Sequence, residues 1–179
     1  MADYIIQARS FRLGFACHNF WVLADADSER TIGELHGLAT SRLTGQTVPI
    51  GTTLEHSLRV YVYPHAAAYA EALGIPVKFT RMFGRSHAEP VYRGEDALDR
   101  WAAAVAAIPE LNRLDLDYPP LGFNVFGLTV NSNSAYRTFG EIMRVPVHDF
   151  RGVWGIGMRN GMLTSAEIEA LRFQQADTT

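Results

Sequence analysis

The sequence predicts an α+β protein in which an antiparallel sheet is packed with helices. In the first 64 residues, apolar and polar positions alternate, and β-branched and aromatic residues are frequent, as in strands. The rest of the chain carries apolar residues at helical spacing, together with helix-capping residues. Strands that come first and helices that come later are typical of α+β proteins rather than of alternating parallel sheets.

The alternating pattern predicts four strands in the first part of the chain. They lie near Tyr4–Ser10, Phe15–Ala24, Thr31–Ala39 and Leu58–Tyr63. A polar cluster, residues 25–29, separates the second strand from the third and is rich in turn-forming side chains. We therefore expect these two strands to pair as an antiparallel hairpin.

Four helices are expected after the strands. They are Ala66–Leu73, which ends at Gly74; Glu95–Ile108, which stops at Pro109; Ser132–Met143; and a last helix after Thr164, whose spacing to Glu167 makes a capping box. The segment Arg151–Gly161 contains four glycines and is expected to be a loop.

Length and charge limit the classes of protein to which the chain can belong. It has 179 residues without an internal repeat or a linker, so we expect a single domain over 1–179. A net charge of −3 without runs of Lys or Arg argues against nucleic-acid binding. The longest uncharged apolar run, Trp101–Pro109, is too short for a transmembrane segment. Charged residues interrupt the N-terminal apolar patches, so we expect a cytoplasmic protein, or one exported without a classical signal peptide.

Two residue types occur once each and exclude several chemistries. The only lysine, Lys78, follows Val77, whereas a phosphate-binding P-loop needs glycine before its lysine. The only cysteine, Cys17, excludes an internal disulfide and a cysteine-based zinc site. No motif calls for a cofactor.

Two histidines fall on the strands of the predicted hairpin. Directly opposed residues of an antiparallel pair have a constant index sum, and the sum of 54 for His18 and His36 centres the turn on Asp27. The two imidazoles would then be cross-strand neighbours, with Glu34 on the same face. With an even number of loop residues, His18 would face Leu35 or Gly37 instead, and the pairing would be lost.

The histidine pair allows more than one interpretation. It fits a base with its orienting partner, half of a metal site, or two separately hydrogen-bonded structural histidines. A metal site needs a third ligand, and neither His56 nor His65 stands at metal-binding spacing from the pair. We therefore assign no metal ligands.

A second candidate site begins the helix predicted over Ser132–Met143. The run Asn131-Ser132-Asn133-Ser134 precedes apolar residues at helical spacing. A nucleophile at this place gains backbone N–H groups that hold an oxyanion and the positive end of the helix dipole. Ser132 is the candidate nucleophile. The alternative is that these residues only cap the helix, because Asn and Ser are preferred N-caps.

Taken together, the two motifs resemble a known superfamily. This is the circularly permuted NlpC-like papain superfamily, in its lecithin retinol acyltransferase-like branch. The His-aromatic strand of that branch resembles Cys17-His18-Asn19-Phe20-Trp21-Val22-Leu23. Its helix start resembles Asn131-Ser132-Asn133-Ser134-Ala135-Tyr136. With the Leu35-His36-Gly37 strand, the resemblance covers about a third of the chain. It implies a papain-like fold and a hydrolase or acyltransferase that cleaves a lipid ester or a peptide amide, including that of a cell-wall peptide, with a small molecule, a lipid or a peptide as substrate.

The resemblance also implies roles for individual residues. His18 would be the base, His36 its orienter and Ser132 the nucleophile, with Asn131, Asn133 and Glu34 as orienting or oxyanion-binding residues. The chain departs from the family because Ser132 replaces the usual cysteine nucleophile, and a serine needs a base to take its proton. Cys17 does not substitute for it, because neighbouring strand residues point to opposite faces.

Three functions are open at this point. The first is a Ser-His-His enzyme, which the superfamily also connects with bacterial effectors that an inhibitory or immunity protein neutralises. The second is a non-catalytic binding domain on the same fold, and the third is a histidine-based metal hydrolase.

Overall fold

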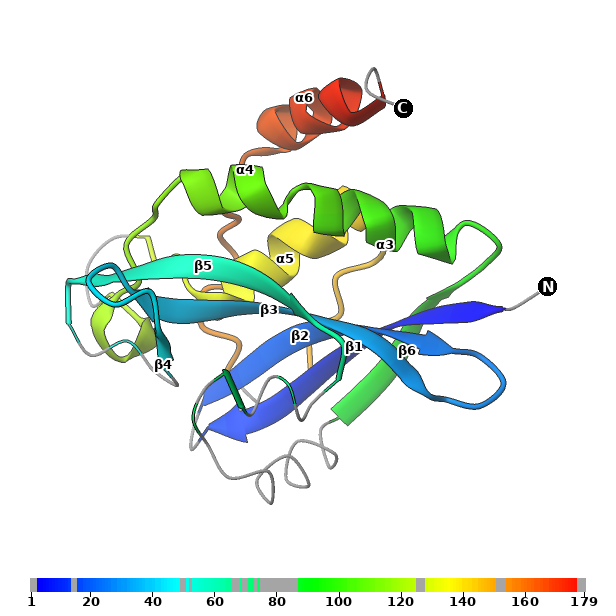
Figure 1. Ribbon diagram of the computed structural model, residues 1–179, viewed down its shortest axis with the longest axis horizontal. Coiled ribbons are helices and arrows are strands. Elements are labelled where there is room, and N and C mark those ends of the chain that lie inside the picture. Colours follow the sequence, from blue (N-terminus) through cyan, green and yellow to red (C-terminus); the bar gives the residue numbers. More distant parts are fainter. Residues whose placement is uncertain are drawn as a thin grey trace.

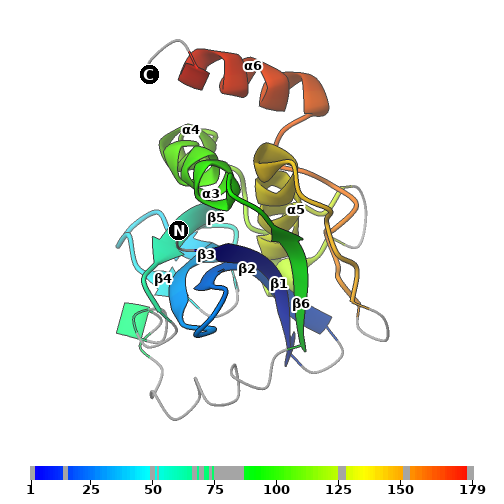
Figure 2. The ribbon, with the colours of Figure 1, turned by 90° about the vertical axis from the view of Figure 1, so that its right-hand side faces the viewer.

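The fold is an antiparallel sheet covered on one face by helices, as the computed structural model shows (Figures 1 and 2). The structure describes residues 3–13, 16–48, 51, 53–65, 68, 71–72, 74, 87–124, 128–150 and 154–176. The predicted α+β class is confirmed.

The described sheet has six strands: β1 (Tyr4–Leu13), β2 (Ala16–Asp25), β3 (Thr31–Ser41), β4 (Thr47–Val48), β5 (His56–Tyr63) and β6 (His87–Arg93). The main path runs β4-β3-β2-β1-β6, while β5 pairs with β3, and every pairing is antiparallel. The four predicted strands are thus confirmed, each to within a few residues at its ends.

Two strands were not anticipated. The two-residue strand β4 is too short to produce an alternating pattern. Strand β6 contains Pro90, which weakens a strand prediction because proline has no N–H for the ladder. It pairs with β1 alone among the described strands, and its register shifts between Ile6 and Gln7.

The hairpin of β2 and β3 has a different register from the one expected. Trp21 pairs with Leu35 and Val22 with Glu34, so the index sum on the side of the histidines is 56 rather than 54; a register shift next to the turn makes it 55 at Ala24 and Thr31. The predicted direct opposition of His18 and His36 is therefore wrong. Because the shift is an even number, both histidines stay on one face, where they are diagonal neighbours.

The described helices are α3 (Ala97–Ala106), α4 (Ile108–Arg113), α5 (Ser132–Met143) and α6 (Ser165–Ala176), with a 3-10 turn, η2, at Pro120–Gly122. The expected stop at Pro109 is wrong, because Pro109 begins the new helix α4, in whose first turn a proline is tolerated. The capping box of Thr164 and Glu167 is confirmed. Most of the predicted helix Ala66–Leu73 lies outside the described residues.

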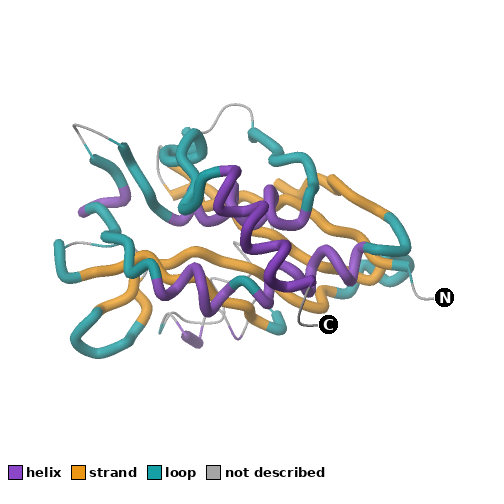
Figure 3. The backbone as a smooth tube through the Cα atoms, turned by 90° about the horizontal axis from the view of Figure 1, so that it is seen from above, coloured by secondary structure: helices purple, strands orange, loops and turns teal. Residues whose placement is uncertain are grey.

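Helices α3, α4 and α5 form a layer on the sheet, and α6 crosses the outer side of this layer (Figures 2 and 3). α5 packs on β2 and β3 through a core centred on Trp21, Leu35 and Tyr136. A smaller cluster of Phe11, Phe20, Val22, Ala24 and Leu38 occupies the other face of the sheet. Among the described residues, no helix has the length and apolar character needed to cross a bilayer.

Polar groups hold both ends of α5. At its start, the Asn131 side chain accepts a hydrogen bond from the Asn133 amide, and the Ser134 hydroxyl accepts one from the Asn131 amide. At its end, Arg100 donates to the carbonyls of Met143 and Arg144. A cation at a helix C-terminus is favourable because the carbonyls there carry partial negative charge. The central helix is therefore fixed in position along its axis.

We expect Gly37→Ala to destabilise the fold by about 1–3 kcal/mol because it overpacks the interface between the sheet and α5. A Cβ at Gly37 would lie 2.4 Å from the Ala135 Cβ. Urea unfolding measures the loss. The double variant Gly37→Ala/Ala135→Gly should recover part of it, since the closest clash is then removed. Equal stability of Gly37→Ala and wild type would contradict this packing.

Candidate histidine and helix-start site

Consecutive residues of β3 face different sides of the sheet. A Cβ on Gly37 would meet Ala135 and Ser132 of α5, so this residue faces the helix layer. His36, the residue before it, stacks on Phe20 with ring centroids 4.6 Å apart, within the cluster on the other face. The two candidate motifs of the sequence thus approach β3 from opposite sides.

The two histidines contact each other directly. His18 Nε2 lies 3.0 Å from His36 Nδ1, and the rings are nearly parallel, with centroids 5.3 Å apart. Phe11 packs against His18, with ring centroids 5.0 Å apart. Both histidines are buried, with exposed fractions of 4% for His18 and 1% for His36. The structure therefore brings together the two histidines that the sequence singled out.

Glu34 extends the pair into a chain of three side chains. Its Oε2 lies 3.1 Å from His36 Nε2, and the carboxylate is itself buried. A carboxylate accepts, so His36 Nε2 donates to it and His36 Nδ1 is left as an acceptor. His18 Nε2 must then donate to His36. This arrangement leaves Nδ1 of His18 as its unprotonated, basic nitrogen.

Burial determines the protonation of the pair. Desolvation lowers the pKa of His18 well below its ordinary value, and the neighbouring His36 lowers it further. Desolvation also lowers the pKa of His36, while the hydrogen bond and charge of Glu34 oppose that shift. Both imidazoles are therefore neutral near pH 7, which is the state that a general base requires.

Ser132 occupies the first position of α5, on the helix side of β3. Its Cα lies 3.2 Å from where a Gly37 Cβ would be. The hydroxyl of Tyr118 reaches both the side chain and the backbone of Ser132, and burial raises the pKa of that phenol, so it remains a hydrogen-bond donor. Among the described residues, no hydrogen bond joins Ser132 to His18 or His36, whose rings lie on the other face of the sheet.

The strands separate at the level of these residues. The ladder between β2 and β3 runs from Ala24 to Trp21 on β2, and His18 lies beyond its last pair. The first turn of α5 lies over this place. Asn133 donates to the carbonyl of Cys17 and accepts from the amide of Asn19, both on β2.

The two asparagines expected to orient the reaction bind backbone groups instead. The side-chain Nδ2 of Asn131 donates to the backbone carbonyls of Gly122 and Ile156. Asn133 also donates to Ile156. These bonds hold the helix start against β2 and against the loop at residues 154–160. Asn131 and Asn133 therefore position Ser132.

Cys17 is buried and projects away from His18, as expected from strand alternation. Its thiol is near Ser10 and Asn19, and burial, the largest effect, raises its pKa. The thiol form is favoured, so Cys17 has the character of a packing residue rather than of a nucleophile.

Tyr118 was not found by sequence reasoning. It lies outside both motifs, and it reaches Ser132 because Gly51 leaves room for its ring: a Cβ on Gly51 would lie 2.6 Å from Tyr118. Proximity between these residues is a tertiary property that no local spacing reveals.

Within the part of the chain that the structure describes, no group of three or more His, Cys, Asp or Glu side chains is arranged to hold a metal ion.

In the comparisons with known proteins, no family model, curated protein or solved structure matches the chain.

Stability should fall as the pH decreases below about 6.5, the ordinary pKa of histidine. In this range the unfolded chain binds protons at His18 and His36, while the folded protein resists them, and each histidine adds up to about 1.4 kcal/mol per pH unit. Urea unfolding at pH 7 and pH 5 measures the slope. We expect a shallower slope for His18→Gln.

Cys17→Ala is the matched control, because Cys17 neighbours His18 but faces away from it, and this variant should keep the wild-type slope. Identical slopes for His18→Gln and wild type would show that His18 does not resist protonation in the folded state.

Proposed function

We propose that the protein is a hydrolase or acyltransferase that cleaves an amide or an ester by way of an acyl-enzyme on Ser132. The observation that carries the proposal is the buried chain from Glu34 through His36 to His18, on the face of the sheet opposite α5. Such a chain gives the base a defined tautomer and stabilises it when it takes up a proton.

The proposed reaction has two steps. His18 Nδ1 takes the proton of the Ser132 hydroxyl while the oxygen attacks the carbonyl carbon, and the same proton then passes to the leaving amine or alcohol. Water, or a second alcohol or amine, attacks the resulting ester in the same manner and releases the acyl group. No metal or cofactor enters either step.

The hydroxyl of Ser132 has to reach His18 past β3. Two features favour this approach: the β2–β3 ladder has ended at this level, and Ser132 stands opposite Gly37, which carries no side chain to block it. Catalytic hydrogen bonds are often long before substrate binds. A turn of the Ser132 side chain away from Tyr118 is therefore part of the proposal.

The Tyr118 hydroxyl and the Ser132 amide form the proposed oxyanion site. Both lie at the positive end of α5, where developing negative charge is favoured. The raised pKa of the phenol suits this role because the group stays neutral and donates.

The substrate class and setting follow from the resemblance to the NlpC-like superfamily. It favours a lipid ester, a peptide amide or another small molecule as substrate. It also favours a bacterial effector that an inhibitory protein neutralises, acting in the cytoplasm or after export.

A non-catalytic binding domain is the second candidate. It is favoured by the burial of both imidazoles among aromatic rings and by the contact between Ser132 and Tyr118. In that case the histidines stabilise the sheet and Ser132 only begins the helix.

A fluorophosphonate probe separates the two functions without knowledge of the substrate. We expect covalent labelling of Ser132, located by peptide mass spectrometry, and a loss of labelling rate of about 1000-fold or more in His18→Ala, because the serine then has no base. Loss of His36 or Glu34 should slow labelling about 10–100-fold, since these residues only orient His18.

Cys17→Ala is the matched control, since Cys17 neighbours His18 but faces away from it. Its labelling rate should equal that of the wild type. The proposed enzyme would be excluded if Ser132 of the folded protein stays unlabelled, or if His18→Ala and wild type are labelled at equal rates. The non-catalytic binding domain would then be the remaining function.

Tyr118→Phe tests the oxyanion site. The variant keeps the ring and its packing but loses the donor, so we expect kcat on an ester substrate to fall about 10–100-fold with little change in KM. Thermal unfolding verifies that the fold is retained. A changed KM at constant kcat would place Tyr118 in ground-state binding instead.

A further inference from the structure

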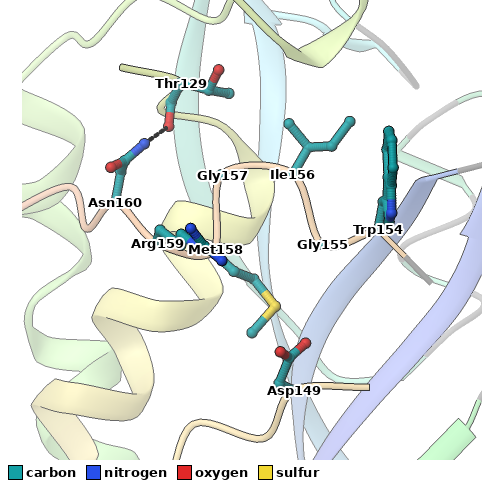
Figure 4. Close-up of a pocket in the computed structure, with 9 residues that line it drawn as sticks. All are labelled: Thr129, Asp149, Trp154, Gly155, Ile156, Gly157, Met158, Arg159 and Asn160. Atoms are coloured by element: carbon teal, nitrogen blue, oxygen red, sulfur yellow. Dashed lines mark hydrogen bonds between the residues drawn. The ribbon is translucent and has the colours of Figure 1, made fainter. Parts of the chain in front are cut away.

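A hollow of about 430 Å³ opens beside the start of α5, and we propose that it binds an organic ammonium group (Figure 4). The loop at residues 154–160 forms most of its wall, and Thr129 and Asp149 complete it. Its volume is within the range of small-molecule sites.

An exposed indole and a carboxylate give the hollow its preference for a cation. Trp154 is 72% exposed, which is unusual for a residue whose large apolar ring is normally buried. The carboxylate of Asp149 points toward the loop that carries Trp154 (Figure 4). The negative face of an aromatic ring and a nearby carboxylate both attract ammonium groups.

The wall of the hollow also carries a positive charge, on Arg159 of the same loop. Arg159 lies beyond Met158 as seen from Trp154 (Figure 4). A ligand with an ammonium group at Trp154 and Asp149 would therefore meet a guanidinium at the other end of the hollow. The arrangement admits a cation that also carries an anionic or polar group.

Beneath the loop is a buried acceptor with an unmet hydrogen-bonding capacity. Asn19 is 1% exposed, and within the described part of the chain its Oδ1 has no hydrogen-bond partner. Its Nδ2 donates to the Met158 sulfur, a weak acceptor that lines the hollow. Because methionine side chains are flexible, a ligand that displaces Met158 gains access to the Asn19 amide.

The hollow is coupled to the helix start. The carbonyl of Ile156, in the loop, accepts hydrogen bonds from both Asn131 and Asn133. A ligand in the hollow would thus contact the loop that binds Asn131 and Asn133, the chain neighbours of Ser132. As a substrate subsite the hollow rests on the proposed function, whereas its binding of an ammonium group can be measured without turnover.

Tryptophan fluorescence tests the binding directly. Trp21 and Trp101 are 0% and 7% exposed, so Trp154 is the exposed one of the three tryptophans. We expect tetramethylammonium chloride, at constant ionic strength, to change the emission saturably in wild type and to have no such effect in Trp154→Phe.

Asp149→Asn should weaken the binding about threefold or more because the carboxylate is lost. Arg159→Gln is the matched control from the same wall and should bind at least as tightly as wild type. A non-saturating change, or equal affinity of Asp149→Asn and wild type, would overturn the proposal. Thermal unfolding of each variant verifies that the loop variants are folded.

Two further ligands distinguish the sources of the ammonium group. Choline represents a lipid headgroup, and butylamine represents an amino-acid side chain; tighter binding of one identifies the source. Neutral tert-butanol should not bind. Ser132→Ala cannot form an acyl-enzyme, and we expect it to bind tetramethylammonium saturably. Saturable binding together with an unlabelled Ser132 in wild type would keep the ammonium site and exclude the acyl-enzyme, so the two proposals fail separately.

Discussion

The attachment of the first turn of α5 to β2 and to the loop at residues 154–160 is the constraint on which the candidate site depends. Asn133 bonds to the β2 backbone on both sides of His18, and Asn131 and Asn133 share the carbonyl of Ile156. Buried amides of this kind are costly to leave unpaired, so the helix start has one position. That position determines where Ser132 lies and how the loop that lines the hollow is attached to α5.

The other half of the site is fixed by desolvation rather than by attachment. His18, His36 and Glu34 form a chain in a cluster of aromatic rings, and burial keeps the imidazoles neutral. Neutral histidines linked to a carboxylate have defined tautomers. The sheet thus holds two neutral imidazoles on one side of β3 and a helix N-terminus on the other, at the level where the β2–β3 ladder has ended.

Much of this arrangement was predictable from local patterns. Helix α5 was predicted with its observed bounds, because its capping residues and apolar spacing are local. The proximity of His18 and His36 followed from the hairpin, although its register did not. The register depends on the turn of residues 25–30 and on the shift between Leu23 and Ala24, which alternation alone does not encode.

The sequence by itself determined the α+β class, four strands, the helix start at Ser132 and the orientation of Cys17 away from His18, because period, capping and strand alternation are local properties. Only the tertiary structure decided that Ser132 and the histidines approach β3 from opposite sides and that Tyr118 reaches Ser132. These relations depend on which face of the sheet receives α5. That choice follows from the packing of Trp21, Leu35 and Tyr136 in one core, a result of the whole chain rather than of any segment.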